Sequence, residues 1–158
     1  MINIQPVSIK TFAAVTQLKI SAAQEEYIPD NTFLLAMSKV LPNCTPLAIF
    51  HDGEIVGFAL YGLDEDRTKY WIHIMMIDAR HQGKGYAKEA FEKVLAIIQR
   101  DKTVHKIVLA VNKGNASAVQ IYEKRGFVFT NIRLEEIKWA VKIYGGLLNE
   151  EYIMELCY

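Results

Sequence analysis

Residues 70–100 read YWIHIMMIDARHQGKGYAKEAFEKVLAIIQR, and we expect the rest of the chain to be organised around them. The stretch begins with an apolar, aromatic run fit for a buried strand and continues through a short turn with two glycines. Apolar residues then recur at spacings of three and four, with charged residues largely between them, as in an amphipathic helix. These apolar positions are Ala87, Ala90, Phe91, Val94, Leu95, Ile97 and Ile98. The stretch therefore predicts a strand, a glycine-rich turn and a helix.

The glycine turn is suited to bind an anion. The first N–H groups of a helix have no intrahelical partners, and the helix dipole favours negative charge there. Gly83 and Gly85 allow successive backbone N–H groups to converge, and Lys84 and Lys88 add positive charge nearby. We therefore expect a phosphate or pyrophosphate ligand at this turn.

Two common phosphate-binding loops do not match this turn. It lacks the spacing and the Lys-Ser/Thr ending of a P-loop, and it lacks the third glycine of a dinucleotide fingerprint. The run Gln82-Gly83-Lys84-Gly85-Tyr86-Ala87 remains to be explained. An ordinary glycine-containing connection between strand and helix is the structural alternative to a ligand site.

The length and composition of the chain fit one soluble globular domain, residues 1–158. Its 18 Lys and Arg balance 18 Asp and Glu, so the net charge gives no reason to expect a nucleic-acid or membrane partner. The sequence shows neither a signal-peptide pattern nor a run that spans a bilayer, so a cytoplasmic protein is expected. Cys44 and Cys157 do not form a disulfide framework or a zinc-site spacing, so no metal is expected and both are interpreted as buried small hydrophobes or free thiols.

Outside the central stretch, hydrophobic periodicity and turn residues predict further helices and strands. The expected elements are a strand from Ile2, helices at 12–20 and 32–40, strands at 47–50 and 55–63, a strand at 107–111, a helix at 116–125, a strand from Phe127, strand or helix at 137–144, and a closing strand at 152–156. This order, β-α-α-β-β-β-α-β-α-β-β, favours an α/β (α+β) fold with a mixed central sheet and helices on both faces.

A second motif follows the strand at 107–111. Residues 115–127 read NASAVQIYEKRGF, which resembles the Asn-x-x-Ala-x-x-x-Tyr-x-Lys-x-Gly-Phe run of the GCN5-related N-acetyltransferases, the GNAT superfamily. The glycine turn resembles the same superfamily's Gln/Arg-x-x-Gly-x-Gly/Ala signature, with Gln82, Gly85 and Ala87 at its defining positions. A frame that starts at Arg80 also fits the letters, and the first is preferred because it leaves the usual link between strand and turn.

This resemblance implies the GNAT fold, with acetyl-coenzyme A (acetyl-CoA) as acetyl donor. The pyrophosphate is then expected on the backbone of Gln82, Gly83, Lys84, Gly85, Tyr86 and Ala87. The pantetheine arm is expected along Met75, Met76 and Ile77, because strands that separate at this point leave backbone groups unpaired. Asn115 and Lys124 are expected to contact the cofactor from the neighbouring helix.

Transfer of an acetyl group to an amine needs a neutral amine and a proton for the departing thiolate. The resemblance implies Tyr122 as the proton donor, with packing of an amphipathic helix as the alternative role. His73 is the candidate base, because it lies in the central strand and histidine titrates near neutral pH. A structural histidine is the alternative, with ordered water or a carboxylate such as Glu25, Glu26 or Glu54 removing the proton.

The N-terminal half also resembles bacterial spermine/spermidine N-acetyltransferases, in residues 21–28 and 56–62. Residues 77–78 and the closing strand add to this resemblance. It departs from them at His73-Ile74, where those enzymes tend to carry an Asp-Arg pair, and in a longer tail. The acceptor residues expected for a polyamine are Glu25, Glu26, Tyr27, Tyr61 and Trp71, which offer carboxylates and aromatic faces for cations.

The expected function is therefore acetyl-CoA-dependent N-acetylation of a primary amine, most simply a polyamine such as spermidine or spermine. The alternatives are a GNAT enzyme acting on another small amine or a protein amine, and a module that binds acetyl-CoA without catalysis. A homodimer is a further expectation, because the apolar, aromatic tail at 139–158 can pair or exchange strands.

Overall fold

The computed structural model describes residues 1–25, 28–41, 43–145 and 150–158. Its strands are β1 (Ile2–Pro6), β2 (Cys44–His51), β3 (Glu54–Leu63), β4 (Tyr70–Ile77), β5 (Lys106–Asn112), β6 (Val128–Arg133) and β7 (Glu151–Cys157). Its α-helices are α1 (Phe12–Gln17), α2 (Asn31–Val40), α3 (Tyr86–Ile98), α4 (Ala116–Glu123) and α5 (Lys138–Tyr144). Short 3₁₀ turns are η1 (Ala22–Gln24), η2 (Ala79–His81) and η3 (Leu134–Glu136).

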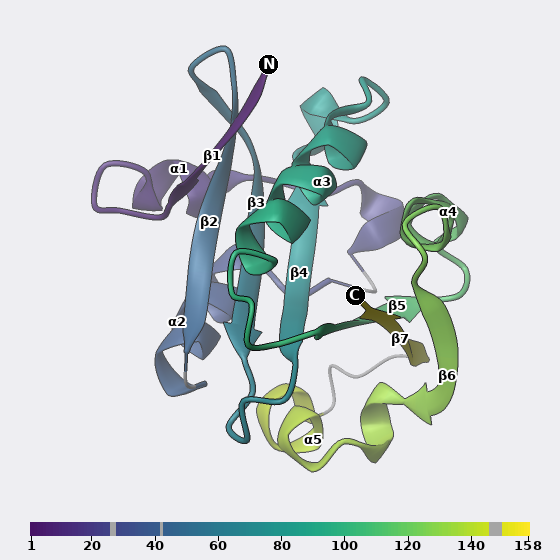
Figure 1. Cartoon of the computed structure of the whole chain (residues 1–158). Coiled ribbons are helices and arrows are strands. Elements are labelled where there is room, and N and C mark those ends of the chain that lie inside the picture. The colour runs from purple at the N-terminus through teal and green to yellow at the C-terminus, as the bar shows by residue number, and fades with distance from the viewer. Residues whose placement is uncertain (26–27, 42, 146–149) are drawn as a thin grey trace.

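A seven-stranded sheet runs through the molecule in the order β1-β2-β3-β4-β5-β7-β6 (Figure 1). β4 and β5 pair in parallel, and the other described pairs are antiparallel. Parallel pairing needs a crossover connection, which α3 supplies. The mixed α/β sheet predicted from the sequence is confirmed.

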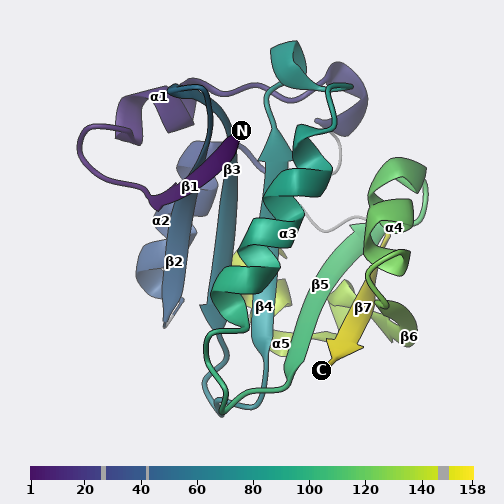
Figure 2. The same ribbon diagram turned by 45° about the horizontal axis from the view of Figure 1, so that its top comes forward.

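Helices cover both faces of the sheet. On one face, α3 buries Phe91 and Val94 in the largest core cluster, and α4 packs against the same cluster. On the other face, α1 and α2 bury Val15 and Leu34 against Phe58. Figure 2 shows α3 in front of β4, with α4 beside β5 and β7. The strand that precedes α3 and the helix itself thus form the centre of the molecule, as residues 70–100 predict.

The sequence pattern at residues 137–144 is compatible with strand or helix, and the structure shows helix α5 between β6 and β7. Ala140 is fully buried against Trp71 and Val108, and Trp139 packs beside it. Tyr144 follows Ala140 by four residues, so both lie on the helix face that covers the sheet. The predicted element order lacks this helix, and the other expected helices and strands occur in the predicted order.

None of the helices in the described part of the chain combines the length and apolar character needed to cross a bilayer. Within the same residues, no three His, Cys, Asp or Glu side chains come together as a metal site requires. Cys44 and Cys157 are free thiols, and Cys157 is exposed rather than buried.

Candidate active site

β4 and β5 are paired at their start and separate toward their carboxyl ends (Figure 2). Their pairing stops at Ile72 and Leu109, although β4 stays paired with β3 as far as Ile77 and β5 stays paired with β7 as far as Asn112. Beyond Ile72, the backbone N–H and C=O groups of β4 that face β5 therefore have no strand partner. Such an edge can bind an extended ligand that carries amide groups.

A β-bulge lies where the two strands separate. In the pairing of β3 with β4, Leu60 faces Ile74 and Tyr61 faces Ile72, so His73 has no partner residue in β3. A bulge bends its strand and increases the local twist, and β4 diverges from β5 directly beyond it. No glycine or proline marks this bulge in the sequence of β4.

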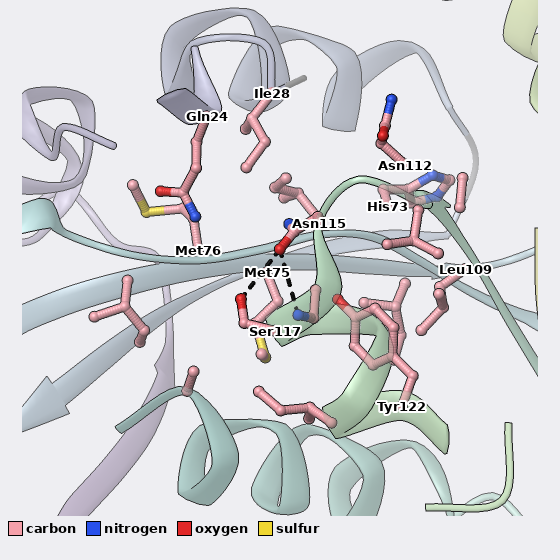
Figure 3. A pocket seen from close by; sticks show the side chains of 18 of the residues that line it. Gln24, Ile28, His73, Met75, Met76, Leu109, Asn112, Asn115, Ser117 and Tyr122 are labelled. Carbon is pink, nitrogen blue, oxygen red and sulfur yellow. Dashed lines mark hydrogen bonds between the residues drawn. The ribbon is translucent and has the colours of Figure 1, made fainter. Parts of the chain in front are cut away.

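A cavity of about 310 Å³ occupies the gap between the strands, and α4, α5 and the glycine turn complete its walls. This volume is at the lower end of the range for small-molecule sites. Figure 3 shows side chains of β4, β5 and α4 around it, with Gln24 and Ile28 from the segment before α2. Most of the predicted cofactor residues line it, namely Met75, Met76, Ile77, Gln82, Gly83, Gly85, Tyr86, Ala87 and Asn115. Lys84 and Lys124 do not line it.

The glycine turn has the backbone conformation of an anion-binding loop. Gly83 and Gly85 have φ of +75° and +80°, a region that favours glycine. Gly85 is the N-cap of α3, and no side chain caps the helix there. A Cβ added at either glycine would enter open space, where a bound phosphate would otherwise approach the N–H groups. The turn therefore fits a phosphate group.

Gln82 fastens the turn to its surroundings. Its Nε2 donates to the carbonyl of Ile77 at 2.9 Å and to Oε1 of Gln24 at 2.8 Å. On the α4 side of the cavity, Asn115 caps α4, because its Oδ1 accepts from the N–H of Ala118 (Figure 3). Both side chains hold backbone segments in place around the cavity.

A buried carboxylate, to which the sequence analysis assigned no role, holds the end of β4 in place. Asp78 is 1% exposed and accepts hydrogen bonds from the Arg80 side chain, the Arg80 N–H and the Lys19 N–H. Burial opposes its ionisation, but the hydrogen bonds from Arg80 and Lys19 outweigh it and lower the pKa of Asp78 to about 2. The guanidinium of Arg80, the first position of the alternative motif frame, is thus bound to Asp78.

Tyr122 projects from α4 into the cavity (Figure 3). Its ring packs against Phe91, with ring centroids 5.0 Å apart, and against Phe127. Its hydroxyl makes no hydrogen bond within the part of the chain that the structure describes. Burial, and then the negative charge of Glu151, raise the pKa of Tyr122 to about 12, so the phenol keeps its proton at neutral pH.

His73 packs against two tryptophan rings that also contact each other. Its ring stacks near Trp71 and meets the edge of Trp139 at a centroid distance of 5.4 Å. Nε2 is 3.5 Å from Sγ of Cys44, and the buried Nδ1 has no hydrogen-bond partner among the described residues. Burial lowers the pKa of His73 to about 4, below the near-neutral range expected from the sequence. The ring is neutral at pH 7 and a weak base.

The predicted acceptor residues are only partly brought together. Trp71 lines the cavity, whereas Tyr61 does not, because it packs beside Tyr70 at the edge of the core. Glu25 is exposed and does not line the cavity, although its neighbour Gln24 does. Glu26 and Tyr27 lie outside the described residues. Glu54, an alternative base, is 3.3 Å from His81 and also lies outside the cavity.

The acidic turn between β3 and β4 borders a second cavity, which shares Trp71, His73 and Trp139 with the first. Two of its carboxylates close the turn itself. Asp64 pairs with Lys69 Nζ at 2.7 Å and accepts from the Thr68 N–H, and Asp66 accepts from the Thr68 hydroxyl. The charge of Asp64 is therefore already matched by Lys69, and Asp66 is hydrogen-bonded within the turn.

Sequence reasoning missed Glu151 and Tyr144, which both line the cavity between β4 and β5. Burial raises the pKa of Glu151 to about 7, and burial followed by the charge of Glu151 raises the pKa of Tyr144. The sequence signal is weak, since an acidic residue at the start of a strand is usually solvated. Only the pairing of β7 with β5 brings Glu151 to the cavity.

Comparison with known proteins identifies the family. The model of the acetyltransferase (GNAT) family matches residues 12–127. The chain is 31% identical over 134 residues to the spermine/spermidine N(1)-acetyltransferase of Bacillus subtilis (strain 168), and the alignment covers 81% of this chain and 88% of that protein.

Solved structures share the fold over nearly the whole chain. A spermidine N-acetyltransferase from Vibrio cholerae in complex with CoA and spermine has a TM-score of 0.74 at 17% identity, covering 99% of this chain and 95% of that one. The ribosomal-protein-S18-alanine N-acetyltransferase of Escherichia coli has a TM-score of 0.73 at 18% identity, covering 99% and 94%. The matching family model and the Bacillus subtilis relative establish that the chain belongs to the acetyltransferase (GNAT) family.

Proposed function

We propose that this chain is one N-acetyltransferase domain, residues 1–158, that transfers an acetyl group from acetyl-CoA to a primary amine of spermidine or spermine. The observation that carries the proposal is the cavity between β4 and β5, which has a phosphate-fitting turn at its mouth and Tyr122 in its wall. The polyamine acceptor is supported by the Bacillus subtilis relative at 31% identity.

The cofactor end of this site consists mainly of backbone. The N–H groups of residues 82–87 would hold the pyrophosphate, and the unpaired edge of β4 at Met75, Met76 and Ile77 would hold the amides of the pantetheine arm. Lys84 lies between the two glycines, where its charge favours a phosphate. Asn115 borders the same cavity, whereas a cofactor contact at Lys124 stays a prediction.

When bound, acetyl-CoA supplies an activated thioester. Loss of its thiolate is helped by a nearby proton donor, and Tyr122 fits that role. Its hydroxyl faces the cavity without a partner among the described residues, and its raised pKa keeps the phenol protonated at neutral pH, so that its O–H can donate to the sulfur as negative charge develops there. The amine nitrogen replaces sulfur on the acetyl carbon, and the proton that the amine loses on attack balances the proton gained by sulfur.

His73 is a poor candidate for the base that deprotonates the amine. An ammonium group has a pKa of roughly 10, and a ring with a pKa of about 4 competes weakly for its proton. The neutral ring can still accept a hydrogen bond from the amine. The aromatic walls at Trp71 and Trp139 offer cation–π contacts to the rest of a polyamine.

The test is release of CoA thiol from acetyl-CoA by the purified protein. Separate reactions contain spermidine, spermine, lysine, an aminoglycoside or a peptide with a free N-terminus. We expect saturable thiol release that is at least tenfold more efficient with the two polyamines. Equal rates with every amine would contradict the polyamine assignment, and binding of acetyl-CoA without amine-dependent release would contradict the enzyme assignment.

A further inference from the structure

Glu151 lies at the start of β7, where the sheet borders the cavity. It pairs with Asn112, the last residue of β5, beside the gap left where β4 and β5 separate. Its side chain lines the cavity together with Tyr122 from α4 and Tyr144 from α5. The antiparallel pairing of β5 with β7 thus brings a carboxylate to the wall that contains the proposed proton donor.

This carboxylate has no counter-charge in the described structure. Among the described residues that line the cavity, Glu151 is the one Asp, Glu, Lys or Arg side chain, and no hydrogen bond or ion pair to its carboxylate is formed. Glu155 on the same strand differs, because it pairs with Lys106 at 3.3 Å. A carboxylate withdrawn from water without a cation is costly to ionise. The cavity therefore favours a ligand that brings a positive charge to Glu151.

We propose that the carboxylate of Glu151 binds the ammonium group of the acceptor and takes one proton from it, so that the neutral amine attacks the thioester beside Tyr122. This inference rests on the proposed function. One N–H bond of the ammonium breaks and one O–H bond of Glu151 forms. The nitrogen lone pair then forms the amide bond, the C–S bond breaks, and Glu151 later returns its proton to solvent.

The surroundings of Glu151 suit this role better than those of His73. Burial raises the pKa of Glu151 to about 7, which places its proton affinity near neutral pH, where a base is most effective. The titratable groups that border the same cavity are Tyr122, Tyr144 and His73, together with His81 and Tyr86 near the glycine turn. The phenols at Tyr122 and Tyr144 have raised pKa values and His73 is neutral, so these groups bring no cation to Glu151 at pH 7.

The experiment is the pH dependence of kcat/KM for spermidine in the wild-type protein, Glu151→Gln, Glu151→Asp and Glu155→Gln. In the wild type we expect kcat/KM to fall about tenfold per pH unit below pH 7. In Glu151→Gln the amine must arrive neutral, so the rate at pH 7 should fall about a hundredfold or more and recover about tenfold per unit toward pH 9. Glu155→Gln, on the same strand, should keep the wild-type profile.

A structural role for Glu151 would lower the rate by one factor at every pH, and that result would overturn the proposal. If Glu151→Gln does not fold, Glu151→Asp decides, because it keeps a carboxylate. If kcat/KM of Glu151→Asp is lower than in the wild type but still falls as the pH drops below 7, the base role is supported. If its kcat/KM does not fall below pH 7, the base role is contradicted.

Binding separates this inference from the proposed function. If the wild type binds acetyl-CoA but releases no thiol with any amine, the proposed function fails. Spermidine affinity, measured by calorimetry in the presence of CoA, then decides the role of Glu151. Binding at least tenfold weaker in Glu151→Gln supports the ammonium contact, and equal affinities overturn it.

Discussion

The two ends of the cavity are built in different ways. The mouth is made mainly of backbone, from the glycine turn at 82–87 and the unpaired edge of β4, and it lies within one contiguous stretch of sequence. The inner end is made of side chains, with His73 from β4, Tyr122 from α4, Trp139 from α5 and Glu151 from β7. These elements are far apart in sequence and meet only through the sheet.

This difference affects how the two ends respond to substitution. A backbone site needs a particular local conformation, so it is sensitive to residues that change φ. A side-chain site depends on burial, which shifts the pKa of each titratable group so that its neutral form is favoured. Substitutions at the mouth of the cavity should therefore weaken the binding of acetyl-CoA. Substitutions at the inner end should slow the reaction and alter its pH dependence.

The largest effect is expected for Tyr122→Phe. Removing a proton donor should lower kcat by about 10²–10³-fold, while the dissociation constant for acetyl-CoA changes less than threefold. The ring keeps its packing against Phe91, so folding should be unaffected. Steady-state thiol release and calorimetric titration with acetyl-CoA measure the two quantities. Unchanged turnover would remove Tyr122 from the chemistry and leave it a packing residue.

The pH dependence of stability should differ in sign between His73 and Glu151. The folded-state pKa of His73 is about 4 against 6.5, so its contribution is present above pH 6.5 and lost as pH falls toward 4. The folded-state pKa of Glu151 is about 7 against 4.5, so its contribution is present below pH 4.5 and lost as pH rises through 7. Each of these two contributions to the free energy of unfolding has a maximum of about 3 kcal/mol.

Between pH 4.5 and 6.5 these two contributions oppose each other in the wild type. Urea unfolding across this range should therefore show stability that rises with pH in Glu151→Gln and falls with pH in His73→Phe, by about 1.4 kcal/mol per pH unit relative to wild type. Parallel curves for all three proteins would show that neither group is buried as described.

At the mouth of the cavity, Gly85→Ala should weaken acetyl-CoA binding about ten- to hundredfold. The new Cβ would enter the space above the turn, and φ of +80° costs an alanine about 1–2 kcal/mol. Gly53→Ala is the matched control, because Gly53 has φ of +86° and open space in a turn away from the cavity. Both variants should lose similar stability, and only Gly85→Ala should lose affinity. Equal affinities in the two variants would contradict a phosphate site at the turn.

The smallest effect is expected for Asp64→Asn, in the acidic turn. Loss of its pairing with Lys69 and Thr68 should lower the free energy of unfolding by about 1 kcal/mol. The KM for spermidine should stay within twofold of wild type, because this carboxylate is already paired. A KM increase above fivefold would move the acceptor site toward the second cavity.

The sequence predicts most of the fold because its signals are local. Amphipathic spacing indicates α3, and apolar runs between turn residues indicate β4 and β5. The glycine turn is also local, so the mouth of the cavity can be predicted from the sequence of residues 82–87. At 137–144 the sequence pattern is compatible with both strand and helix. Only the contacts of Ala140 and Trp139 with the sheet select the helix.

The inner end of the cavity could be predicted only in part. Tyr122 follows from a motif, but the lowered pKa of His73 depends on burial against Trp71 and Trp139, and Trp139 is far from His73 in the sequence. Glu151 reaches the cavity because β7 pairs between β5 and β6, an order that differs from the order along the chain. A non-local pairing of this kind carries no short-range signal.

The most direct test of the account is hydrogen exchange with and without acetyl-CoA. If the unpaired edge of β4 and the glycine turn hold the cofactor, backbone amides in residues 73–77 and 83–88 should exchange more slowly when acetyl-CoA is bound, while those of β1 and β2 stay unchanged. Protection confined to other segments, or no protection at saturating acetyl-CoA, would contradict a cofactor site between β4 and β5.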